Sequence, residues 1–270
     1  MRTLATAAFL CLITVPLPAQ WVHYPTQGLP RKPGGAPNLD GPAPRMADGK
    51  PDFSGIWQPE KTRPCPPEGC DDMQIGEEFL NIGWGVKSGL PYQPWARDLV
   101  QARKGLNGQE DPGTRCLPTG IMMMHTTPLL KKIVQVPGLL VILNERNAMY
   151  RQIFTDGRAL PADPQPGWLG YSTAKWDDGA LMVETAGFRD GIWLDRAGSP
   201  LTGAGKITER FRRVNFGRLE IQITVDDPKA YTAPWTVTLN QFLVPDTELL
   251  DYICLENEKD ISHFSDRAPR

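Results

Sequence analysis

Two glutamates on expected strands are the first residues to consider for chemistry. Successive side chains of a β-strand point to opposite faces. Glu209 therefore shares a face with Ile207 and Phe211, and Glu145 shares a face with the aliphatic residues just before it. A carboxylate on an apolar face is costly unless it is paired. Desolvation also raises its pKa toward the range that general acid–base catalysis uses.

Nearby arginines give both glutamates a structural alternative. A buried Glu145–Arg151 pair would explain the first pattern without catalysis, and a Glu209–Arg213 pair would explain the second. Simple exposure near a strand end is a third interpretation. If either glutamate is catalytic, Arg151 or Arg213 would stabilise an anion. The glutamate would then carry the proton, and His125 is a candidate partner because histidine titrates near neutral pH.

His125 follows three consecutive methionines, and a hydrogen-bonded loop residue without a chemical role is the alternative interpretation. Three aromatic residues, Tyr171, Trp176 and Trp193, are candidate walls for a flat or partly apolar ligand. Plain packing explains any one of them equally well.

Several common chemistries lack their sequence signals. The chain has no Gly-x-Ser-x-Gly elbow and no Gly-x-Gly-x-x-Gly after a strand, so a serine hydrolase and a dinucleotide fold are unsupported. We expect no cofactor and no metal. The formal net charge of −2 and the lack of a basic stripe with interleaved aromatics argue against nucleic acid.

Residues 1–19 have the pattern of a secretory signal peptide, with an early Arg2, an apolar stretch from Leu4 to Val15, and Ala19 at the cleavage position. The stretch is too short for a membrane anchor, although an uncleaved anchor is the alternative. We therefore expect an exported protein, periplasmic or secreted, with no membrane span after cleavage.

Four of the five cysteines remain after cleavage, and an even number in an exported chain favours disulfides. We expect a local Cys65–Cys70 bridge. A Cys116–Cys254 bridge would then tie the segment before the barrel to its last strand. Other pairings stay open. A zinc site is the weaker alternative, because one Cys-x4-Cys pair has no second pair and the chain has only three histidines.

The segment 131–256 reads as strands joined by tight turns such as Pro137-Gly138 and Asp178-Gly179. The expected strands are Lys131–Val136, Leu139–Glu145, Met149–Thr155, Tyr171–Asp177, Leu181–Gly187, Lys206–Phe216, Arg218–Asp226, Trp235–Val244 and Glu248–Cys254. A meander must cover its edges, and closure is the usual solution. We predict a mainly β fold, an antiparallel up-and-down meander that closes into a lipocalin-like barrel.

The rest of the chain is expected to pack around this barrel. Residues 20–50 form an extended Pro/Gly-rich arm, residues 51–130 an irregular region, and residues 257–270 a C-terminal tail. Short helices are expected at Glu77–Ile82 and Trp95–Lys104. Alternation in the strand 218–226 predicts burial of four side chains: Leu219, Ile221, Ile223 and Val225.

Seven short motifs resemble a large family of exported bacterial proteins that is common in soil acidobacteria and related lineages. They are PDFSGIW (51–57), RCLP (115–118), KIVQ (132–135), DGR (156–158), TERFRR (208–213), DDPKAY (226–231) and CLENE (254–258). The likeness extends from about Pro51 to His263. The motifs are specific to the family but do not specify a reaction.

This chain departs from the family pattern at three places. Members often carry a histidine in the loop that here reads Gly198–Lys206, and another after Asp-Gly-Arg, where this chain has Ala159-Leu160. Their usual Glu-Gly-Asp-Thr turn is Asp177–Ala180 here. If those histidines form a metal or acid–base site, this chain has lost it. The resemblance then implies a divergent member with a binding role or a different chemistry.

Two main hypotheses follow. The first is a barrel that binds a small, partly apolar molecule in its cavity. The alternative is a cofactor-free acid–base enzyme, such as a lyase, isomerase or hydrolase, that uses an interior glutamate in the same cavity; a structural protein is a third possibility. Paired interior carboxylates in an open, wet cavity favour the enzyme. Carboxylates neutralised by arginine beside an apolar cavity favour binding.

Overall fold

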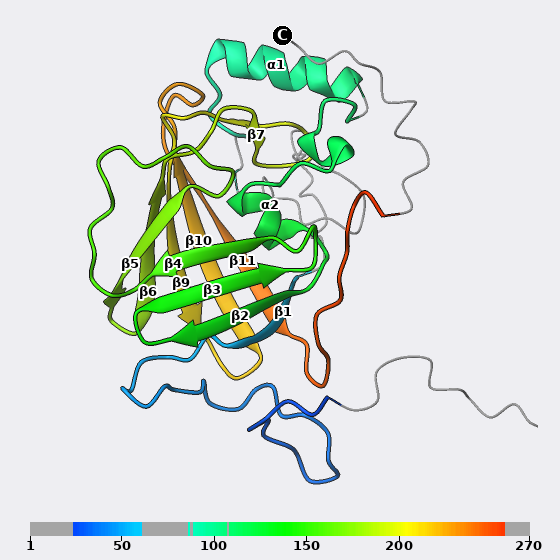
Figure 1. Cartoon of the computed structure of the whole chain (residues 1–270), viewed down its shortest axis with the longest axis vertical. Helices are drawn as coiled ribbons and strands as arrows, with labels where there is room; N and C mark the ends of the chain where they lie inside the picture. Colours follow the sequence, from blue (N-terminus) through cyan, green and yellow to red (C-terminus); the bar gives the residue numbers. More distant parts are fainter. Residues whose placement is uncertain (1–23, 61–85, 87–88, 107, 257–270) are drawn as a thin grey trace, which may run out of the picture.

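The computed structural model describes residues 24–60, 86, 89–106 and 108–256. Within them, nine strands form one closed barrel (Figure 1). The strands are β1 (Gly55–Pro59), β2 (Lys131–Val136), β3 (Leu139–Asn144), β4 (Tyr150–Phe154), β5 (Tyr171–Asp177), β6 (Ala180–Ala186), β9 (Lys206–Arg213), β10 (Arg218–Asp226) and β11 (Trp235–Leu243). Their order around the barrel is β1-β11-β10-β9-β6-β5-β4-β3-β2. The predicted mainly β barrel is therefore confirmed.

Strand alternation builds the core as the sequence indicates. On β10, Leu219, Ile221, Ile223 and Val225 are all completely buried, while the residues between them face outward. Burial of each such side chain contributes roughly 1.5–3 kcal/mol relative to an exposed one. The inward face of this strand is therefore fixed in register, because a slip by one residue would exchange the apolar and polar faces.

The barrel is closed by a strand from the irregular region and not by the C-terminal segment. β1 pairs with β2 on one side and with β11 on the other. The expected strand Glu248–Cys254 does not form, and this segment makes a single bridge, from Tyr252 to Arg146. Its apolar residues do not alternate, and Leu250 stays about half exposed, whereas β1 buries Trp57 completely. Burial of that large indole makes β1 the better closing strand.

One strand pair is parallel, so the meander is not purely antiparallel. β4 and β5 run in the same direction, with Ile153 opposite Ser172, while the other barrel pairs are antiparallel. A two-residue hairpin forces antiparallel neighbours, but a long connection does not. The proline-rich connection between Phe154 and Tyr171 is long enough to return to the end of the barrel where β4 began.

Helices lie at one end of the barrel (Figure 1). α1 (Pro94–Gly105) matches the expected helix Trp95–Lys104 and buries Ala96 and Val100. α2 (Ile121–Thr126) was not expected, and a 3-10 turn, η2 (Pro112–Arg115), precedes it. A separate small sheet joins β7 (Ile192–Trp193) and β8 (Pro200–Leu201) near α1. None of the described helices is both long and apolar enough to span a membrane.

The Pro/Gly-rich arm crosses the opposite end of the barrel (Figure 1). The backbone N–H groups of Phe216 and Gly217 donate to the carbonyls of Gly41 and Leu39, at 2.8 and 2.7 Å. A bridge between Arg45 and Pro51 then shapes residues 46–50 into a small hairpin. This hairpin faces the open end of the barrel, called the mouth below, at which the β2–β3 turn lies.

The long-range disulfide is confirmed: Cys116 is bonded to Cys254, with a Cα–Cα distance of 5.4 Å. It joins the segment after η2 to the C-terminal segment. That segment was expected to be a strand and does not form one. The expected Cys65–Cys70 bridge, the helix Glu77–Ile82 and the signal segment 1–19 lie outside the described residues.

Candidate functional site

The helix α2 closes one end of the barrel and brings His125 into the interior. All six of its residues are buried, and it contacts β1 and β11. Gln241 on β11 donates from Nε2 to the carbonyl of His125 at 3.0 Å. The hydroxyls of Thr126 and Thr127 donate back to helix carbonyls at 3.1 and 2.7 Å. These bonds satisfy the helix end and fix the direction of the imidazole.

Glu209 is completely buried, as its strand phase predicted, and it is paired with an arginine other than the expected Arg213. Its partner is Arg151, which donates from Nη1 to Oε1 at 3.0 Å and from Nη2 to Oε2. His125 Nε2 lies 3.0 Å from Oε1. Burial by itself would raise the pKa of Glu209, but the charge and hydrogen bonds of Arg151 and His125 outweigh it and hold the pKa at about 2.

Arg151 is itself saturated by neighbouring hydroxyls. Its Nε and Nη2 donate to Ser172 Oγ at 3.2 and 3.1 Å, and Nη2 also donates to Thr185 Oγ1 at 3.0 Å. Ser172 and Thr185 are joined at 2.9 Å. Glu209 is thus ionised near neutral pH and belongs to a closed network. Such a carboxylate is a poor general acid or base near neutral pH.

The imidazole of His125 is neutral and has one free nitrogen. Burial lowers its pKa most, and the positive charges of Lys131 and Arg151 also lower it, against the opposing effect of Glu209. Because ionised Glu209 can only accept, Nε2 carries the hydrogen of that bond. Nδ1 is then an acceptor, and in the described part of the structure it has no hydrogen-bond partner.

Lys131 was not identified from the sequence, although it lies beside this network. It begins β2 in phase with inward Ile133, is completely buried, and its Nζ has no hydrogen-bond partner among the described residues. Burial lowers its pKa to about 7. The strand face that it shares with Ile133 is the sequence signal that indicates its burial. Without that signal, a lysine at a strand end is expected to be exposed.

The other expected charged residues have structural roles. Glu145 does not contact Arg151; it follows the end of β3 and accepts from the backbone N–H groups of Leu130 and Leu250, both at 3.0 Å. Arg213 does not contact Glu209, because it lies four residues farther along β9, about 13 Å at 3.3 Å per residue. Its partners are backbone carbonyls, among them that of Asp52 at 2.7 Å.

Of the three aromatic candidates, Trp176 lines a pocket among the described residues. Tyr171 accepts a hydrogen bond from Arg158 Nη1 at 3.1 Å on the outer surface. Trp193 is buried under α1, with the Arg103 guanidinium 4.6 Å above its ring. Neither reaches the barrel interior or its mouth.

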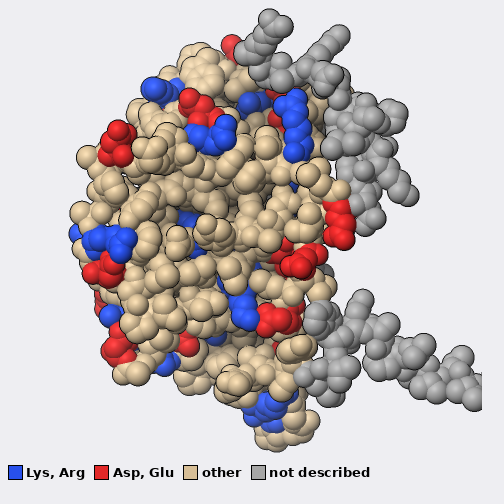
Figure 2. All heavy atoms as spheres, viewed as in Figure 1, with Lys and Arg blue, Asp and Glu red and all other residues tan. Residues whose placement is uncertain are grey.

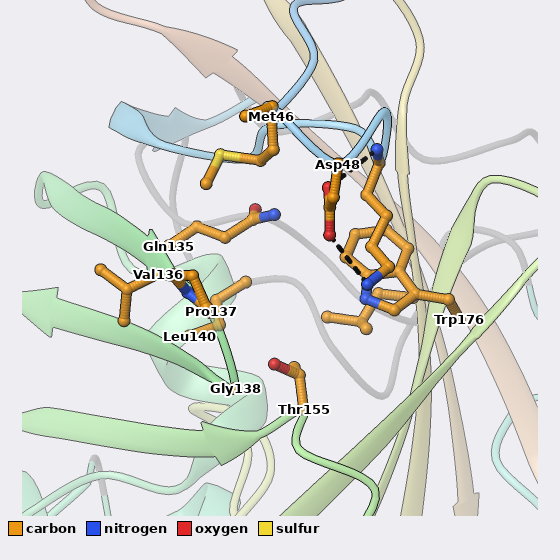
Figure 3. Close-up of a pocket in the computed structure, with 12 residues that line it drawn as sticks. Met46, Asp48, Gln135, Val136, Pro137, Gly138, Leu140, Thr155 and Trp176 are labelled. Atoms are coloured by element: carbon orange, nitrogen blue, oxygen red, sulfur yellow. Dashed lines mark hydrogen bonds and ion pairs between the residues drawn. The ribbon is translucent and has the colours of Figure 1, made fainter.

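A pocket of about 270 Å³ lies where the arm hairpin meets the barrel mouth (Figure 3). It is lined by Met46, Ala47, Asp48, Lys50, Gln135, Val136, Pro137, Gly138, Leu140, Thr155, Trp176 and Leu181. Met46 and Trp176 lie on opposite sides of it, with Gln135 and Thr155 supplying polar atoms. Gly138 has a φ of 79°, which the β2–β3 turn requires and which a side chain would strain.

A series of aromatic rings in contact lies between the pocket and the polar network. Trp176 stacks on Phe53 at 5.6 Å, Phe53 contacts Phe211 at 6.1 Å, and Phe211 meets the edge of the His125 ring at 5.9 Å. Phe53 and Phe211 are completely buried. The pocket is therefore an apolar mouth site, and Glu209 lies behind its floor.

The surface shows no charge pattern that points to a polymeric ligand on the face in view. Figure 2 shows acidic and basic side chains interspersed over a face that is mostly uncharged. Among the described residues, no group of three or more His, Cys, Asp and Glu side chains lies close enough to hold a metal ion.

Comparison of the chain with protein-family models and with curated proteins finds no match. The resemblance to exported acidobacterial proteins therefore stays a prediction, as does the loss of the family histidines.

Proposed function

We propose that this β-barrel protein is exported and binds a small, partly apolar molecule in the pocket at its mouth. The observation that carries the proposal is the cavity of about 270 Å³ between the arm hairpin and the β2–β3 turn. Ligand sites are concave, mostly apolar, and carry a few polar groups. This volume is close to the lower end of their usual range, roughly 300–1,000 Å³, which indicates a small ligand.

The walls are suited to a flat apolar group. Trp176 offers an indole that is held in place by the parallel ring of Phe53. Opposite it, Met46 offers a flexible thioether, a side chain that adapts to irregular apolar shapes. Lys50 lies 5.9 Å from the Trp176 ring and pairs with Asp48 at 2.9 Å, so its charge is already balanced.

Two polar groups would orient the ligand. The Gln135 amide is fixed at both ends, since Oε1 accepts from Phe53 N at 2.9 Å and Nε2 donates to the Pro51 carbonyl at 3.0 Å. Each end keeps one free hydrogen-bonding position. Thr155 adds a hydroxyl from the opposite wall. A ligand with one polar substituent on an apolar body matches this set.

The same geometry argues against the acid–base enzyme with Glu209 as proton carrier. Glu209 is neutralised by Arg151, is held ionised, and is shut off from the pocket by Phe53 and Phe211. Interior carboxylates neutralised by arginine favour the binding hypothesis over the catalytic one. Export is supported by the Cys116–Cys254 disulfide, since such bonds persist in oxidising compartments.

A pocket-filling variant tests the proposal. N-phenyl-1-naphthylamine, a flat neutral fluorophore, brightens when it leaves water and serves as the probe. We expect saturable binding to the intact protein. Ala47→Trp, which fills the pocket, should weaken binding at least tenfold. Ala36→Trp is the matched control, because Ala36 is an exposed alanine of the neighbouring arm turn and does not line the pocket. Equal affinity in the three proteins would refute the mouth site.

A further inference from the structure

The barrel interior holds buried polar groups that the mouth pocket does not use. Lys131 Nζ, His125 Nδ1 and Gln241 Oε1 are all without a hydrogen-bond partner in the part of the chain that the structure describes. Native proteins satisfy most buried polar atoms, so three such atoms in one interior require an explanation. They belong together, because Gln241 holds the carbonyl of His125 and the charge of Lys131 acts on the imidazole.

The charges around Lys131 do not compensate an ammonium group. From β9, Glu209 presents both of its oxygens to Arg151 of β4, and one of them also to His125 of α2. Desolvation is the sole effect that acts on the Lys131 amine, and no acidic side chain opposes it. An amine in this setting gives up its proton, and a neutral amine is a nucleophile.

We propose that Lys131 is a reactive amine that condenses with small aldehydes or ketones to form an imine. The lone pair of Nζ attacks the carbonyl carbon, and one proton moves from nitrogen to oxygen to give a carbinolamine. The hydroxyl then leaves with a second proton as water. One amine and one carbonyl thus give one imine and one water. We assign the transfer of these protons to His125, whose Nδ1 is a free acceptor in the same interior.

Access to the amine is from the end of the barrel that α2 covers. Lys131 begins β2 at that end, and Phe53 and Phe211 block the route from the mouth pocket. Because Nζ is completely buried, imine formation requires a movement of α2 that admits the carbonyl compound. The inference is independent of the mouth pocket.

Reductive trapping on the intact, oxidised protein tests the proposal. The probe is propanal with sodium cyanoborohydride, which converts an imine into a stable secondary amine, and fragmentation mass spectrometry locates it. Lys132 is the matched neighbour: it is partly exposed and its Nζ is bound by Glu248 at 2.6 Å. At pH 7 about half of the Lys131 amines are neutral, against fewer than about one in 1,000 for an ordinary lysine.

We expect Lys131 to be labelled at least tenfold faster than Lys132 at pH 7. Its labelling should level off above about pH 8, because the Lys131 amine is then almost entirely neutral. The fast label should be absent from Lys131→Met and kept in Lys132→Met. Labelling of Lys132 ahead of Lys131 at pH 7, or a Lys131 profile that rises toward pH 10, would overturn the proposal.

Discussion

The unpaired lysine in the barrel predicts that its removal stabilises the protein. The folded-state pKa of Lys131 is about 7, against 10.5 for the free side chain. Each unit of this difference corresponds to about 1.4 kcal/mol. The buried amine therefore costs up to about 5 kcal/mol at neutral pH. Lys131→Met keeps the length of the side chain and removes the amine, so we expect a gain of a few kcal/mol at pH 7.

The sign of the pH dependence separates this explanation from ordinary repacking. Between pH 7 and 10.5 the unfolded state binds more protons at Lys131 than the folded state, so the stability of the native protein rises with pH there. Below pH 7 the amine is protonated in both states and the cost is constant. The advantage of Lys131→Met should be largest at pH 7 and below, and should shrink as the pH approaches 10.5.

Urea unfolding of both proteins at matched pH values measures this difference directly. The comparison at each pH cancels effects that other groups have on both proteins. Lys132→Met is the control, and we expect it to change stability by less than about 1 kcal/mol, because Lys132 belongs to a partly exposed ion pair with Glu248. A Lys131→Met protein that is less stable by the same amount at every pH would refute the reasoning, since it would mean that the ammonium has a stabilising partner.

Three further predictions follow from the interior network and the disulfide. Glu209→Gln should destabilise the protein by about 3–5 kcal/mol in chemical unfolding, because Arg151 would keep a buried, unpaired charge; Glu220→Gln, in a surface ion pair, should cost less than about 1 kcal/mol. Ionised Glu209 contributes about 3 kcal/mol of stability, which should be complete above its unfolded pKa of 4.5 and be lost as the pH falls toward 2. Acid titration of Glu209→Gln should lack this loss. Replacing both Cys116 and Cys254 by serine should lower stability by roughly 2–5 kcal/mol, and an unreduced protein with both thiols free by mass spectrometry would contradict the bridge.

The barrel could be predicted because its signals are local. Turns such as Pro137-Gly138 and the alternation of Leu219 with its neighbours each involve residues close in sequence. The closing strand could not be predicted in the same way. β1 pairs with segments far along the chain, and Trp57 does not indicate which edge it will cover.

The site was predicted in part. Strand phase placed Glu209 inside, but it could not name Arg151 as the partner, because β4 and β9 are not neighbours and their side chains meet only across the closed barrel. α2 could not be predicted from periodicity, because all six of its residues are buried and no polar face marks a helical repeat. Burial of Lys131 does not follow from strand phase alone, because an unpaired buried lysine is rare and a lysine at a strand end is usually exposed.

The most direct test of the mouth site is the indole N–H signal of Trp176 in an NMR titration with N-phenyl-1-naphthylamine. Trp176 lines the pocket, whereas Trp95 lies on α1 at the other end of the barrel and is its control. Substitution of each tryptophan by phenylalanine assigns the two signals. We predict that the Trp176 signal shifts saturably while the Trp95 signal stays in place. An unchanged Trp176 signal at saturating probe would contradict the proposal that this pocket binds a small, partly apolar molecule.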